Sequence, residues 1–208
     1  QQQMKLFIAL LTLTASLLAM EPLVTPQWLH EHLGDENLKI VEVSPVKRYE
    51  KEHIPHAVHT DISEWRFDNG TFLSVKEVKE IEKVIRNLGI EKHSNVVLYA
   101  PIHEPKDLLK ASYIYWVLNY HGVANVALLD GGLEQWKKAG LKVTAKIDAP
   151  KKTNFTASID SSKITHLEYV SQNIKKLPMI DARPSDKYLG INPTPTVKRH
   201  GHISGAMS

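Results

Sequence analysis

The segment VALLDGGLEQWKKAG (126–140) places a strand, a turn and a helix in direct succession. Its first four residues form a continuous apolar run, which is typical of a strand that is buried on both faces. The turn DGG follows, and Leu133 and Trp136 then supply the apolar face of a helix that Gly140 ends. A buried strand that leads straight into a helix is typical of a mainly parallel sheet that is covered by helices.

The same alternation of strand and helix continues toward the amino terminus. Ser74 and Glu77 are predicted to form a capping box at the start of one of the helices. Apolar runs and helical periodicity predict, in chain order, a helix that begins at Thr25-Pro26, a strand at 38–43, a helix from 74 to 88, a strand at 96–99 and a helix over 107–120. We therefore expect an α/β domain of three layers, with functional residues at the carboxyl ends of the strands.

Composition narrows the possible functions. The 208 residues are 42% hydrophobic and 24% charged, with a net charge of +3, as in an ordinary globular protein that has no strong nucleic-acid signal. The chain has no cysteine. It can therefore form neither a disulfide nor a zinc site with thiolate ligands, and it has no cysteine that could act as a nucleophile.

Residues 1–20 have the layout of a secretory signal peptide. Met4 and Lys5 precede an apolar run from Leu6 to Met20, and Glu21 follows it. The alternative is an uncleaved membrane anchor, although the run is short for a span of about 20 residues. We expect export to the periplasm or secretion, with no integral membrane span after the leader is removed.

Two features predict a second domain. Residues 142–162 are rich in Lys, Thr, Asp and Ser and are predicted to be a linker after a first domain, residues 21–141. Phe155, its one large apolar residue, could pin this linker to a domain surface. The segment EVSP (42–45) with Tyr49 recurs as DARP (181–184) with Tyr188, and HIPHA (53–57) recurs as HISGA (202–206). The repeat predicts that residues 163–208 begin a second copy of the fold.

Several of these motifs together resemble one known family. They are IVEVSPVKRYEKEHIPHAV (40–58), NVVLYA (95–100), SYIYWVLNYHGVANVALLDGGLEQWKKAG (112–140) and MIDARPSDKYLG (179–190) with RHGHISGA (199–206). They resemble the tandem-domain rhodaneses, which include thiosulfate and 3-mercaptopyruvate sulfurtransferases. The resemblance implies a usually inactive first domain and a second domain whose cysteine carries sulfur as a persulfide. It also implies transfer from a small anionic donor to a thiophilic acceptor such as cyanide.

The first domain lacks what this chemistry needs. The resemblance places Ala100 at the position of the nucleophile, where alanine offers no thiol. Pro101 and Pro105 lack the N–H groups that a cradle for a persulfide would use, and Glu104 adds negative charge. The alternative is a divergent site that uses His103 and Glu104. We expect this chain to be inactive alone, because it contains only the amino-terminal part of the second copy and no cysteine.

Arg183 is the candidate substrate-binding residue. The resemblance implies that the arginine of the DAR motif binds the anionic end of thiosulfate, which suits the planar, always charged guanidinium. Its counterpart in the first copy is Ser44. The alternative is a structural ion pair with Asp181 or Asp186. Asp181 and its counterpart Glu42 are predicted to brace the turns after their strands.

The histidines suggest a further hypothesis. His53, His56 and His59, or His200 and His202, could bind a metal ion. His53 and His202 more simply satisfy backbone groups near them, and we predict neither a metal nor a cofactor. Three functions therefore stay open: a sulfurtransferase, a non-catalytic binding or scaffold module of the same fold, and an exported metal-binding protein.

Overall fold

The computed structural model describes residues 20–70, 73–102, 104–192 and 197–208. The predicted leader, residues 1–20, lies outside the described residues except for Met20. The first part of the chain contains β1 (Leu23–Val24), α1 (Pro26–Glu31), β2 (Leu38–Val43), α2 (Val46–Tyr49), β3 (Ala57–Thr60), η1 (Ile62–Glu64), β4 (Arg66–Asp68), β5 (Leu73–Val75), α3 (Val78–Asn87), β6 (Asn95–Tyr99), α4 (Pro105–Tyr120), β7 (Val126–Leu129) and α5 (Gly132–Lys138).

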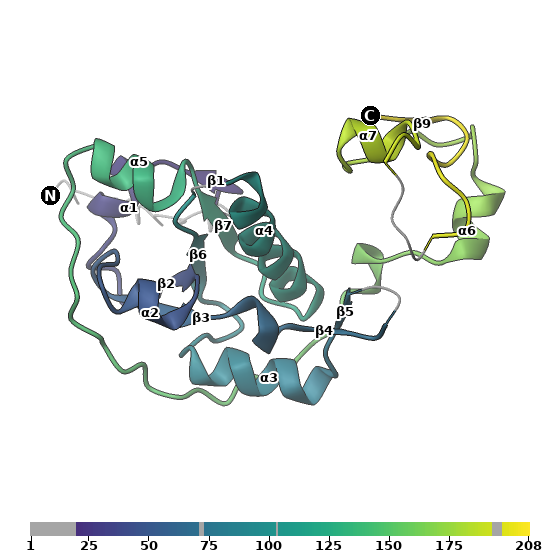
Figure 1. The fold of residues 1–208 in the computed structure, drawn as a ribbon. Coiled ribbons are helices and arrows are strands. Elements are labelled where there is room, and N and C mark those ends of the chain that lie inside the picture. Colours follow the sequence, from purple (N-terminus) through teal and green to yellow (C-terminus); the bar gives the residue numbers. More distant parts are fainter. Residues whose placement is uncertain (1–19, 71–72, 103, 193–196) are drawn as a thin grey trace, which may run out of the picture.

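Five strands form the central sheet, in the order β1-β7-β6-β2-β3, and every neighbouring pair is parallel. Alternate residues of β6 face opposite sides, as the pleat requires. Val96 and Leu98 pack in a core with α3 and α4, whereas Val97 and Tyr99 pack with α1, α2 and α5. The predicted α/β fold with a mainly parallel sheet between helices is confirmed (Figure 1).

The sequence signals for helix caps predicted the start of α1 correctly and the start of α3 incorrectly. Thr25 caps α1 as predicted, because its side chain accepts a hydrogen bond from the Trp28 amide at 3.1 Å. The predicted capping box at Ser74 is wrong. Ser74 lies in β5, opposite Phe67 of β4, and α3 begins only at Val78. Pairing in this hairpin fixes Ser74 in an extended conformation, which outweighs its local preference for a helix cap.

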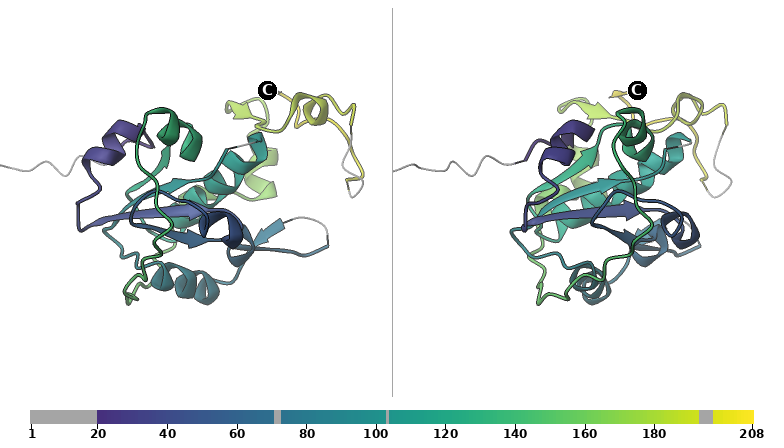
Figure 2. Two further views of the ribbon diagram at one scale, coloured as in Figure 1. Left: turned by 60° about the vertical axis from the view of Figure 1, so that its left-hand side comes forward. Right: turned by 90° about the vertical axis from the view of Figure 1, so that its left-hand side faces the viewer.

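Residues 142–160, here called the strap, return across the domain from α5 to α3 (Figure 2). The Thr144 backbone pairs with His53, and the Thr153 amide donates to the Arg86 carbonyl at 3.2 Å. Phe155 is 4% exposed and packs into the core beneath α3 and α4. Phe155 thus pins this segment to a domain, as predicted, but it does so inside the core and not on the surface.

The remaining residues contain η2 (Ser161–Lys163), α6 (Leu167–Gln172), β8 (Met179–Ile180), α7 (Ser185–Tyr188) and β9 (Ala206–Met207). β8 and β9 form a parallel pair of their own. Large apolar side chains in this part face solvent, among them Leu167, Ile180 and Ile191, which are 78%, 79% and 74% exposed. Residues 161–208 therefore bury little of their apolar surface.

Among the described residues, no helix is long and apolar enough to cross a membrane.

Candidate functional site

The loop after β6 lies against the turn after β7. The Leu133 amide donates to the Ala100 carbonyl oxygen at 3.2 Å, which ties the two loops together. A Cβ atom at Gly132 would lie only 2.2 Å from that oxygen, and Gly132 has a φ of +56°. The second glycine of the DGG turn is therefore required by the backbone of Ala100, which is itself 2% exposed.

Carboxylates of the chain itself occupy the amino terminus of α4. Glu104 and Asp107 form a capping box, in which the Glu104 amide donates to Asp107 Oδ2 at 3.2 Å. Lys106 pairs with Glu104 at 2.8 Å, and Lys110 pairs with Asp107 at 3.0 Å. A helix amino terminus attracts anions, but here two acidic side chains already take that position. His103 lies outside the described residues, so the structure places only Glu104 of the alternative pair.

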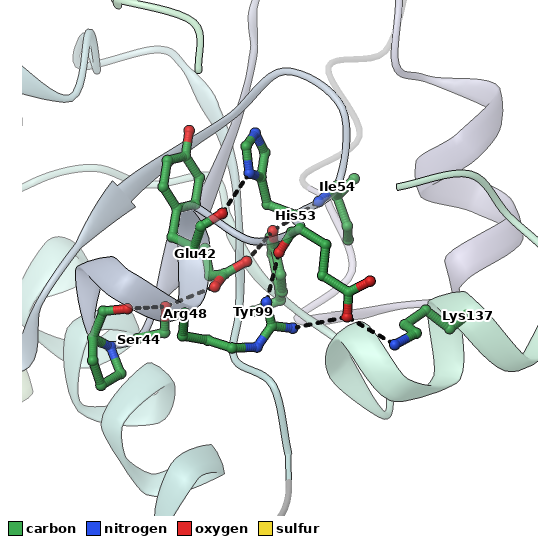
Figure 3. A network of polar contacts seen from close by, with 10 residues as sticks. Glu42, Ser44, Arg48, His53, Ile54, Tyr99 and Lys137 are labelled. Atoms are coloured by element: carbon green, nitrogen blue, oxygen red, sulfur yellow. Dashed lines mark hydrogen bonds and ion pairs between the residues drawn. The ribbon is translucent and has the colours of Figure 1, made fainter. Parts of the chain in front are cut away.

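A buried carboxylate joins the ends of β2 and β6 (Figure 3). Glu42 is fully buried and accepts a hydrogen bond from Ser44 Oγ and another from Tyr99 Oη, each at 2.6 Å. Tyr99 Oη in turn accepts a hydrogen bond from the Ile54 amide at 3.0 Å. Glu42 thus braces the turn after its strand, as predicted, and it also fixes the neighbouring strand.

Tyr49 lies beside this network and holds β3 in place. Its hydroxyl donates to the Ala57 carbonyl at 2.6 Å. Burial raises the pKa of Tyr49 to about 12, and the negative charges of Glu42 and Asp148 add to this effect. Burial and Glu42 also raise the pKa of Tyr99 well above 10.

We expect these two tyrosines to make folding sensitive to alkaline pH. A raised pKa in the folded state means that the stability contribution is complete below the unfolded value of about 10 and is lost as pH rises toward about 12. In an absorbance titration, a late tyrosine step should therefore coincide with unfolding. Tyr49→Phe should shrink that step, because it removes one of the two tyrosines with a raised pKa. A late step of the same size in Tyr49→Phe and in the unmodified protein would contradict this expectation.

The side chains of His53, His56 and His59 contact backbone and side-chain oxygens. His53 is fully buried, stacks on Tyr49 at 3.9 Å between ring centroids, and its Nδ1 lies 2.8 Å from the Tyr49 carbonyl. The predicted local role of His53 is confirmed. His59 Nε2 lies 2.6 Å from the Ser44 carbonyl, and His56 Nδ1 lies 3.2 Å from Asp148. Within the part of the chain that the structure describes, no three acidic or histidine side chains are grouped to hold a metal ion.

The corresponding residues near the carboxyl terminus repeat these contacts. Tyr188 donates from its hydroxyl to the Ala206 carbonyl at 2.8 Å, as Tyr49 does to Ala57. His202 stacks on Tyr188 at 3.9 Å, and its Nδ1 lies 3.0 Å from the Tyr188 carbonyl. The predicted role of His202 in satisfying a nearby backbone group is therefore confirmed as well.

Arg183 forms an ion pair with Asp181. Its Nε and Nη2 donate to the Asp181 carboxylate at 2.9 and 2.6 Å, and Nη2 also donates to the Gly201 carbonyl at 2.8 Å. These bonds lower the pKa of Asp181 to about 2. Asp186, the other partner considered, accepts a hydrogen bond from Asn192 instead. Half of the Arg183 side chain stays exposed, and its role in binding a substrate remains a prediction.

A cavity of about 470 Å³ lies between β5 and α4, lined by Tyr113, Trp116 and Tyr120 together with Ile164. The Tyr113 hydroxyl and His121 Nε2 have no hydrogen-bond partner among the described residues. Both atoms are fully enclosed by their neighbours, so neither meets a molecule in the cavity. Ser74, Lys76 and Glu77 also line the cavity, so its wall combines aromatic rings with polar and charged residues.

The fold and this site define an α/β domain that has an open parallel sheet and a strand-to-helix loop between Tyr99 and α4. The sequence model of the Rhodanese-like domain matches residues 25–139, and the chain belongs to this family.

Curated relatives and solved structures agree with this family. A thiosulfate sulfurtransferase of Mus musculus is 27% identical in an alignment 205 positions long, which covers 89% of this chain and 68% of that protein. A putative thiosulfate sulfurtransferase of Synechococcus elongatus is 30% identical over 93% of this chain and 59% of its own length. The crystal structure of the 3-mercaptopyruvate sulfotransferase SseA from Escherichia coli has a TM-score of 0.74 at 24% identity, covering 90% of this chain and 74% of that one, and shows the shared fold. The chain thus spans about three fifths to two thirds of the length of these two curated relatives.

Proposed function

We propose that this chain is the amino-terminal part of a tandem rhodanese-type sulfurtransferase. In this proposal, residues 21–141 form an inactive first domain and residues 163–208 begin the domain that carries the chemistry. The donor is thiosulfate or 3-mercaptopyruvate, and the acceptor is a thiophile such as cyanide. The curated relatives that are named as thiosulfate sulfurtransferases support this assignment.

One observation carries the proposal of a second copy. The strand, tyrosine and histidine contacts of Tyr49 and His53 recur at Tyr188 and His202, with matching partners and similar distances. In the first copy, β2 pairs with β3 on one side and with the central strand β6 on the other. β8 has only β9 as a partner among the described residues. The exposed Ile180 on β8 fits a strand that lacks further packing partners among the described residues.

The proposed chemistry requires a thiolate. The thiolate attacks the outer sulfur of thiosulfate, the S–S bond breaks, and sulfite leaves with the bonding electrons. The resulting persulfide then gives its outer sulfur to the acceptor, which restores the thiolate. Arg183 would bind the anionic donor, since its guanidinium keeps an exposed edge beside Asp181. No residue of this chain supplies the thiol.

The first domain should stay inactive even when it is given a thiol. We expect Ala100→Cys to form no thiocyanate from thiosulfate and cyanide above the level of the unmodified protein. The introduced side chain would be buried, and Glu104 and Asp107 would oppose a thiolate at the amino terminus of α4. Its reaction with a disulfide reagent should be at least about tenfold slower than that of Ala139→Cys, which places a thiol at an exposed site.

Thiocyanate formation by Ala100→Cys would show that the first domain can host the reaction. The proposal itself is tested by expressing the natural reading frame through any sequence that follows Ser208. A cysteine in a loop after a buried strand, and cyanolysis that Cys→Ser abolishes, would support the sulfurtransferase. A reading frame that stops at Ser208 would instead favour the binding or scaffold module of the same fold.

We also propose that the protein is exported, on the basis of the signal-like residues 1–20. Sequencing the amino terminus of the mature protein from a bacterial periplasmic or culture fraction would test this. A mature protein that begins near Glu21 supports export, and an intact Met4 in the cytoplasm contradicts it.

A further inference from the structure

The last part of the strap is bound closely to the first domain. Residues 153–160, here called the anchored segment, donate three backbone hydrogen bonds to carbonyls near the ends of α3 and α4: Thr153 to Arg86, Ser158 to His121 and Asp160 to Tyr120, at 3.2, 3.0 and 2.9 Å. Phe155 lies between these bonds and is buried in the core. Gly122 leaves the space that the segment needs, because a Cβ atom there would lie 2.7 Å from the Ser158 carbonyl oxygen.

Two side chains of α3 hold the backbone of the anchored segment. Arg86 Nε donates to the Phe155 carbonyl at 2.6 Å, and Glu82 Oε1 accepts a hydrogen bond from the Ala157 amide at 2.9 Å. Glu82 Oε2 also accepts from Arg86 Nη2 at 3.1 Å, so each of the two side chains fixes the other. Hydrogen bonds to ionised groups are stronger than those between neutral groups, and the Glu82 side chain is only 14% exposed. The pair thus clamps the strap backbone on both sides of Thr156.

The middle of the strap lacks comparable contacts. Its beginning is held at His53, whose Nε2 lies 3.0 Å from the Lys146 carbonyl. In residues 147–151, here called the strap loop, Pro150 has no N–H, and the other four amides donate no hydrogen bond to any described residue. Cavities of about 270 and 240 Å³ lie beneath this loop, against Val58 of β3 and Leu88 at the end of α3. Opening the strap loop would therefore break few contacts.

We propose that the strap is a two-part joint, in which the anchored segment is a fixed part of the first domain and the strap loop opens without unfolding that domain. The Glu82–Arg86 clamp then sets the point at which the rest of the chain leaves the domain. The folded unit ends at Asp160 and not at Leu141. This inference does not depend on the proposed sulfur chemistry, because it concerns only the contacts of the strap with the first domain.

Amide hydrogen exchange of the full chain distinguishes the two parts of the strap. Corrected for intrinsic rates, the Ala157 amide should exchange at least about a hundredfold more slowly than the Ile147 amide. Similar rates in the two parts would overturn the two-part joint. Arg86→Met should raise the Ala157 rate at least about tenfold, because Glu82 loses the charged group that fixes it. Lys83→Met, at an exposed position of the same helix, should leave that rate unchanged. An equal rate in both variants would reject the clamp.

Matched insertions test the same division through stability. Gly-Ser-Gly inserted between Asp148 and Ala149 should leave the urea midpoint unchanged, because lengthening a flexible loop adds little closure entropy. The same insertion between Thr156 and Ala157 should lower the midpoint, because the Phe155 and Ala157 contacts can then no longer form together. Equal effects of the two insertions would contradict the proposal. If the second variant does not fold, the exchange rates of the unmodified protein decide the question.

The exit point of the chain can be measured with spin labels. The chain has no cysteine, so two introduced thiols can be labelled selectively. The distance distribution between labels at Lys83→Cys and Ser161→Cys should be unchanged by the insertion after Asp148, and it should broaden in Arg86→Met. Broadening by the insertion would show that the length of the strap, and not the clamp, sets the exit point, and it would overturn the proposal.

Discussion

Gly132→Ala should destabilise the protein by at least about 3 kcal/mol, or prevent it from folding. The new Cβ would lie 2.2 Å from the Ala100 carbonyl oxygen, a backbone atom at the end of the central strand β6. That oxygen cannot move away without breaking its hydrogen bond with the Leu133 amide. The left-handed φ of +56° adds strain to the steric overlap.

Gly140→Ala is the matched control for this substitution. Gly140 has a similar φ of +73°, but nothing lies within 4 Å of the added Cβ atom. Its cost should be about 1 kcal/mol, which reflects the backbone conformation alone. Urea unfolding of the two variants gives the comparison. Equal losses would mean that the approach of the β6 and β7 loops is not what Gly132 provides.

The sequence predicted the strands β2, β6 and β7 and the helices α1, α3, α4 and α5, because each carries its own apolar pattern. It did not predict β1, α2, β3, η1, β4 or β5. Val96 to Tyr99 and the DGG turn indicate buried strands and the change to a helix without knowledge of their neighbours. Ser74 was misplaced because its conformation depends on Phe67, across the β4–β5 hairpin. Local propensity contains no information about such a partner.

The contacts of the candidate site also fall into two groups, those that the sequence could predict and those that it could not. The sequence identified Glu42 as a brace and His53 as a ligand of nearby backbone, and both roles follow from residues within a few positions along the chain. It could not reveal that Tyr99 shares the carboxylate, or that Lys146 meets the second nitrogen of His53, because these contacts join residues 57 and 93 positions apart. Nor could it decide that Arg183 pairs with Asp181, since Asp186 lies only three positions away, against two for Asp181.

The buried carboxylate of Glu42 predicts the second large effect. Glu42→Leu should lower the free energy of unfolding by about 3 kcal/mol, because two buried hydroxyl groups lose their acceptor. Ser44 can turn toward the Pro45 carbonyl, which lies 3.3 Å from its Oγ, but the Tyr99 hydroxyl proton has no such substitute among the described residues. Most of the cost should therefore arise at Tyr99.

A double-mutant cycle tests that assignment. Tyr99→Phe removes the stranded hydroxyl, so Glu42→Leu should cost clearly less in the Tyr99→Phe background than alone. Part of the loss should remain, because Ser44 Oγ still loses its carboxylate acceptor in that background. Glu52→Gln, which breaks an exposed contact with Lys137, should leave the urea midpoint unchanged. Additive losses in the cycle would show that the carboxylate stabilises the fold through another contact, and the bridge between β2 and β6 would not be its main role.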